Sequence, residues 1–126
     1  DLSNSEKISD RVIDGVNIKQ TLLNHSQSER TNIIYYRERE IYAIRHGGFK
    51  AHFIIKGAYN YPKGSNKKIV LDVPLLFNLD LDPSEKYNIA EKYPEKVKKI
   101  KKIAEDHINS FDPPKSLLDT RNSNKF

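Results

Sequence analysis

Residues 41–57, IYAIRHGGFKAHFIIKG, constrain the fold of this chain more than any other segment. Two apolar stretches, residues 41–45 and 49–56, lie on either side of the pair Gly47-Gly48. Glycine tolerates the positive φ that a tight hairpin turn requires. The run therefore predicts two short antiparallel strands joined by a tight turn.

The second of these strands has two unlike faces, because successive side chains of a strand point to opposite sides. One face is apolar and consists of Phe49, Ala51, Phe53 and Ile55. The other is mixed and consists of Lys50, His52, Ile54 and Lys56. We expect the apolar face to pack under a helix and the mixed face to meet water or a partner.

The rest of the chain adds strands and one long helix. Further strands are predicted at residues 33–36, 69–71 and 75–79, and Asn17 is a plausible N-cap for a short helix over 17–24. Pro94 suits the first position of a helix. The apolar stripe of the helix that begins at Pro94 consists of Val97, Ile100, Ile103, Ala104, Ile108 and Phe111. The fold class expected is α+β, a small antiparallel β-sheet of about four strands with one long C-terminal helix packed on one face.

Composition limits what the chain can be. Its 126 residues suffice for one domain with a modest core, and the apolar runs are too short to cross a bilayer. Cysteine is absent, which excludes disulfides, thiolate nucleophiles and cysteine-bound metals. The chain begins at Asp1 and contains no methionine, so we expect it to be a piece of a longer polypeptide.

The net charge of +5 raises the question of an anionic partner. Much of the positive charge lies on the predicted helix, at Lys96, Lys98, Lys99, Lys101 and Lys102. This spacing favours a solvated helix face over a nucleic-acid footprint. A freestanding basic module that binds an anionic glycan or nucleic acid stays open as an alternative.

Few side chains suggest chemistry of their own. The four histidines are scattered without metal-site spacing, and the acidic residues Asp80, Asp82 and Glu85 lack a calcium-loop pattern and indicate a turn. His52, beside Lys50 on the mixed face, could donate a hydrogen bond to an anion or a sugar hydroxyl. A strand histidine can equally be a structural group whose hydrogen bonds are satisfied.

Several motifs together resemble one family. They are Ala-Ile-Arg-x-Gly-x-x-Lys-x-His-Phe in residues 43–53, Pro-x-Leu-Phe-Asn-Leu in 74–79 and Asp-Pro-Ser-Glu-x-Tyr-Asn in 82–88, with an upstream Asp-Gly-Val segment near Asp14. In this order they resemble the C-terminal subdomain of sulfatases of the arylsulfatase type, over roughly residues 10–112.

The resemblance implies a division of the chain and a set of substrate-binding residues. Residues 1–28 would be a linker and short helix that leave the catalytic domain, 29–112 the C-terminal subdomain, and 113–126 a tail. His52, Lys50 and Arg45 would line the substrate cleft, with His52 at the position of the family's Lys-x-His motif. The partners implied are the catalytic N-terminal sulfatase domain and a sulfated substrate.

The resemblance also implies chemistry that this chain lacks. Sulfatases hydrolyse sulfate esters with a formylglycine, made in a Cys/Ser-x-Pro-x-Arg motif, and a calcium ion. No such motif occurs here, so we expect no catalytic residue in this chain, no cofactor of its own and no activity when it is alone. Sulfatases of this type commonly work in the periplasm or outside the cell.

Overall fold

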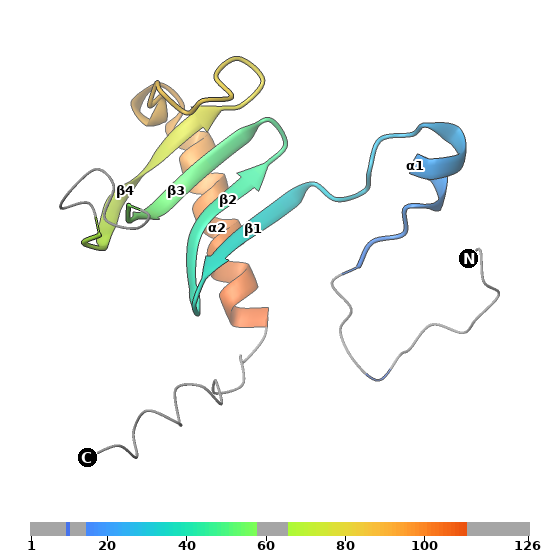
Figure 1. The fold of residues 1–126 in the computed structure, drawn as a ribbon, viewed down its shortest axis with the longest axis horizontal. Helices are drawn as coiled ribbons and strands as arrows, with labels where there is room; N and C mark the ends of the chain where they lie inside the picture. Colours follow the sequence, from blue (N-terminus) through green and yellow to red (C-terminus); the bar gives the residue numbers. More distant parts are fainter. Residues whose placement is uncertain (1–9, 11–14, 58–65, 111–126) are drawn as a thin grey trace.

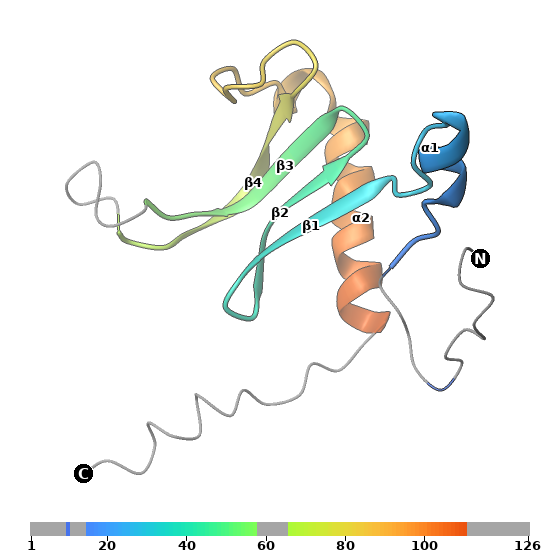
Figure 2. The same ribbon diagram turned by 45° about the vertical axis from the view of Figure 1, so that its right-hand side comes forward.

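The computed structural model describes residues 10, 15–57 and 66–110. The elements, in chain order, are α1 (Lys19–Asn24), β1 (Asn32–Arg37), β2 (Glu40–His46), β3 (Phe49–Ile55), β4 (Ile69–Asn78), the 3₁₀ turn η1 (Ala90–Lys92) and α2 (Pro94–Ser110). The strands form one antiparallel sheet in the order β1-β2-β3-β4. Helix α2 lies across one face of this sheet (Figures 1 and 2), which confirms the predicted α+β fold.

The hairpin between β2 and β3 is the one that the glycine pair predicts. His46 pairs with Phe49, so only Gly47 and Gly48 lie between the paired residues. Gly47 has a φ of 59°, in the left-handed region that residues with a Cβ adopt only at a cost in free energy. The Gly48 carbonyl accepts a hydrogen bond of 2.7 Å from the amide of Leu79, which ties the turn to the end of β4.

The core lies between the sheet and α2. Ile44, Ala51 and Leu76 face one another across β2, β3 and β4 and are fully buried. Val97, Ile100 and Ala104 of α2 complete the cluster. Phe49 and Phe53 are partly buried against it, so the predicted apolar face of β3 does pack under the helix.

Strand β4 differs from the sequence prediction. The pattern indicated two short strands, over 69–71 and 75–79, whereas the structure has one strand of 10 residues. Pro74 lies inside it and is buried. A proline is tolerated there because β4 is an edge strand, where no further strand needs the missing N–H.

The apolar stripe of α2 is shorter than predicted. Ile108 is 58% exposed, so assigning it to the core was wrong. The helix contacts the β1–β2 hairpin there through His107, whose ring centroid lies 6.0 Å from that of Tyr36. Phe111 falls outside the described residues.

The short helix α1 begins at Lys19, with Ile18 rather than Asn17 as its N-cap. The Asn17 side chain still accepts a hydrogen bond of 3.0 Å from the amide of Lys19. None of the residues of α1 is buried. Across the described ranges, no helix combines the length and the apolar character needed to cross a membrane.

Candidate functional site

The mixed face of the sheet, opposite α2, carries the two side chains singled out from the sequence. Lys50 and His52 lie two residues apart on the central strand β3, with Arg45 beside Lys50 on β2. On the other side, β4 places Phe77 opposite Lys50. Phe77 is buried, and its ring meets that of His52 edge-on at 5.7 Å. Both polar side chains therefore have the apolar side chain of Phe77 as a neighbour on β4.

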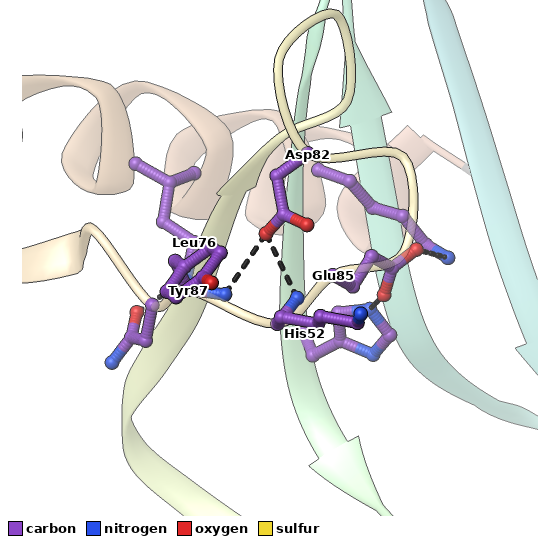
Figure 3. A network of polar contacts seen from close by, with 8 residues as sticks. His52, Leu76, Asp82, Glu85 and Tyr87 are labelled. Carbon is purple, nitrogen blue, oxygen red and sulfur yellow. Dashed lines mark hydrogen bonds and ion pairs between the residues drawn. The ribbon is translucent and has the colours of Figure 1, made fainter.

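The segment between β4 and η1, residues 79–88, is held in place by two of its side chains, which accept hydrogen bonds from backbone amides. The carboxylate of Asp82 accepts bonds of 2.8 Å and 2.9 Å from the amides of Lys86 and Tyr87 (Figure 3). Asn88 accepts from the amides of Leu76 and Ala90. The predicted turn at 80–85 is confirmed, and these bonds fix its path beside the mixed face.

Glu85 extends from this segment to both polar side chains of β3. One carboxylate oxygen lies 2.7 Å from Nζ of Lys50 and the other 2.5 Å from Nε2 of His52. The side chains of Lys50, His52 and Glu85 are 16%, 23% and 25% exposed. Figure 3 shows Glu85 directed at His52. The mixed face is thus partly covered by the chain itself, and each of the three groups keeps some access to solvent.

The electrostatics of this cluster favour an ionised carboxylate. Partial burial alone would raise the pKa of Glu85, because it removes water from the charge. Hydrogen bonds from Lys50 and His52, together with their positive charge, outweigh burial and lower the pKa of Glu85 below its ordinary value of 4.5. Glu85 is therefore an anion over the pH range in which most enzymes work.

A hollow of about 460 Å³ opens on the mixed face next to the cluster. Tyr35, Tyr42, Lys50, His52 and Lys56 are among its lining residues. The ammonium of Lys50 also lies 4.7 Å from the centroid of the Tyr35 ring, a cation–π contact. Aromatic rings and cations around one hollow suit a ligand that has both a ring and an anionic group.

The structure brings together two of the three predicted substrate-binding residues. Lys50 and His52 share the carboxylate of Glu85 and line the hollow. Arg45 lies next to Lys50, but its Nε donates a hydrogen bond of 2.8 Å to the carbonyl of Gly47 in the hairpin turn. The part of the cluster that sequence reasoning missed is Glu85, which it assigned only to a turn.

A metal centre finds no support in the described ranges, 10, 15–57 and 66–110, where no three His, Asp or Glu side chains are grouped closely enough to hold an ion. The carboxylates of Asp82 and Glu85 have other roles, since one accepts from backbone amides and the other from two cationic side chains. The whole sequence also lacks a Cys/Ser-x-Pro-x-Arg motif, in which formylglycine is made. The residues described here therefore do not fit a calcium or formylglycine site.

Comparison with known proteins identifies the family. The family model described as the C-terminal region of aryl-sulfatase matches residues 28–125. The chain belongs to this family. The resemblance carried by the hairpin, β4 and the Asp82–Asn88 motif is thereby confirmed.

Curated relatives of this sulfatase C-terminal region agree. Arylsulfatase A of Bos taurus is 30% identical over 107 residues, which cover 72% of this chain and 21% of the relative. N-acetylgalactosamine-6-sulfatase of Sus scrofa is 28% identical, with 96% of this chain and 27% of the relative covered. The chain thus spans about a fifth to a quarter of the length of these relatives.

Solved structures share the fold. One, from work on the metabolism of multiple glycosaminoglycans by Bacteroides thetaiotaomicron, is 26% identical with a TM-score of 0.61 and covers 83% of this chain and 22% of that one. A Pseudoalteromonas sulfatase structure is 21% identical with a TM-score of 0.52, covers 66% of this chain and 17% of that one, and supports the fold alone.

Proposed function

We propose that this sulfatase C-terminal region packs against the catalytic N-terminal domain of a sulfuric ester hydrolase and forms part of the wall of its substrate cleft. The observation that carries the proposal is the pair Lys50 and His52, half-buried beside a hollow on the sheet face that α2 leaves free. The relatives are about four to five times longer than the part matched here, which leaves room for a catalytic domain.

The chemistry of the wall suits a sulfate ester. The ammonium of a lysine has three N–H donors, and the imidazole of a histidine has two ring nitrogens. Hydrogen bonds from cationic groups to anionic oxygens are stronger than hydrogen bonds between two neutral groups. Lys50 and His52 would orient the substrate, with Arg45 at the margin. Hydrolysis itself would depend on calcium and formylglycine from the catalytic domain, so we infer that the chain alone is inactive.

The test compares this chain with the longest gene product that contains it, using 4-nitrophenyl sulfate as substrate. We expect turnover only by the longer protein. In that protein Lys50→Ala and His52→Ala should each raise KM by about tenfold and change kcat little, because a lost bond to a charged group has about that effect on binding. Lys98→Ala, on the exposed side of α2, is the matched control.

Two results would refute the proposal. One is a longer gene product that hydrolyses no sulfate ester. The other is a KM that is the same in the Lys50, His52 and Lys98 variants. If the chain alone bound heparin or DNA with a steep dependence on salt, the freestanding basic module would be the better description.

A further inference from the structure

We propose that Glu85 is a positioning residue that holds Lys50 and His52 in the orientation in which they meet a sulfate ester. The inference rests on the proposed function, which assigns no role to Glu85. The residue lies 35 positions from Lys50 and 33 from His52 along the chain, yet its two carboxylate oxygens contact one each. A single side chain thus connects both proposed substrate-binding groups to segment 79–88.

Each of the two groups keeps unused hydrogen-bonding capacity after it has met Glu85. The ammonium of Lys50 has three N–H donors, and Glu85 accepts from it through one oxygen. His52 uses Nε2, and within the described part of the chain its Nδ1 has no hydrogen-bond partner. The contact with Glu85 therefore leaves N–H donors of Lys50 available to an anionic ligand in the hollow that both residues line, and Nδ1 of His52 can donate to the same ligand when the ring is an imidazolium, in which both nitrogens carry a proton.

The backbone around Glu85 is built to direct this side chain at β3. Its φ of 54° lies in the left-handed region, which costs a residue with a Cβ roughly 1 kcal/mol. The amide of Glu85 donates to the carbonyl of Asp82, and the Asp82 carboxylate accepts from the next two amides along the chain. Figure 3 shows the resulting loop with Glu85 pointing toward β3.

Holding these two side chains has a definite benefit. A lysine side chain loses much rotamer freedom when its ammonium is fixed, so a substrate that had to fix it would bind more weakly. Glu85 and the Tyr35 ring restrain Lys50 in advance, and Glu85 with the Phe77 ring restrain His52. This preorganisation predicts an effect of Glu85 on substrate binding that passes entirely through Lys50 and His52.

A first experiment uses the 126-residue chain and NMR spectroscopy. In the wild type we expect cross-relaxation between the His52 and Phe77 rings and a slowly exchanging ammonium signal from Lys50. Both should be lost in Glu85→Ala and kept in Glu95→Ala, a control on the exposed side of α2. If both signals persisted in Glu85→Ala, the positioning role would be refuted.

A second experiment measures 4-nitrophenyl sulfate hydrolysis by the gene product that carries this chain. Glu85→Ala should raise KM by about tenfold with kcat within about twofold, and Glu85→Gln, which keeps an acceptor oxygen, should raise it less. In a background that already lacks the Lys50 and His52 side chains, Glu85→Ala should have no further effect.

The outcomes separate this inference from the proposed function. If Lys50→Ala and His52→Ala raise KM but Glu85→Ala does not, the positioning role is wrong and the cleft wall stands. If none of the three raises KM, the cleft wall is wrong and Glu85 positions no substrate-binding group. A kcat loss in Glu85→Ala without a change in KM would also overturn the inference, because it indicates a general loss of folded enzyme.

Discussion

Glu85→Gln should destabilise the fold at neutral pH and leave its stability nearly unchanged in acid. The substitution keeps the shape of the side chain and removes its charge, so the contacts with Lys50 and His52 lose their ionic character. The folded state lowers the pKa of Glu85, so the stabilisation is complete above the ordinary value of 4.5 and is lost as the pH falls through the lower folded value. Protonated glutamic acid and glutamine are then nearly equivalent.

The expected size follows from exposure. A hydrogen bond to a charged group contributes about 1.5–3 kcal/mol when buried, and a fully exposed ion pair about 0–1 kcal/mol. The three side chains are 16% to 25% exposed, so we assign about 1 kcal/mol to each of the two contacts. Glu85→Gln should therefore lower the free energy of unfolding by about 2 kcal/mol near neutral pH, a large part of what a domain of this size has.

The assay is urea denaturation of the wild type and the variant at about pH 7 and about pH 3. The matched control is Glu40→Gln, because Glu40 pairs with Lys68 where both side chains are 42% exposed. We expect a much smaller change in the free energy of unfolding from the control at either pH, because this ion pair is exposed to solvent. A difference between wild type and Glu85→Gln that is equally large at both pH values would contradict the electrostatic explanation.

Three further predictions concern the fold, and urea denaturation measures each of them. Ile100→Ala should lower the free energy of unfolding by about 3 kcal/mol because Ile100 is 1% exposed. Ile108→Ala should lower it by less than about 0.5 kcal/mol because Ile108 is 58% exposed, and similar losses in the two variants would mean that the core is misplaced. Gly47→Ala should cost about 1 kcal/mol and Gly47→Asn less, since φ is 59°, and equal costs would argue against the left-handed turn. Asn88→Ala should cost about 1–2 kcal/mol by leaving the Leu76 amide without its acceptor, and a neutral effect would show that water replaces it.

Local patterns in the sequence were sufficient for most of the fold. The glycine pair at 47–48 fixed the turn of the hairpin, and alternation along 49–55 separated the face that packs under α2 from the mixed face. The spacing of Val97, Ile100 and Ala104 predicted the buried side of the helix. These features follow from the periods of strand and helix, which short segments already show.

The errors in β4 and in α2 arose where neighbouring structure decided the outcome. The pattern divided β4 into two strands, whereas Pro74 lies inside one strand, at the edge of the sheet and beside a break in the register with β3, where a proline is tolerated. Ile108 continued the apolar stripe, but the contact of His107 with Tyr36 shows that the helix meets the sheet through a different residue there. Neither edge position nor the end of a packing interface can be read from spacing.

The cluster on the mixed face shows the same limit at the site itself. The order of residues predicted that Lys50 and His52 share a face, because a strand places alternate side chains on one side. It also predicted that Glu85 belongs to a turn. Only the tertiary structure shows that this turn directs the carboxylate of Glu85 onto β3. Adjacent residues determine a turn, whereas an ion pair between residues more than 30 positions apart depends on how the strands and the loop come together.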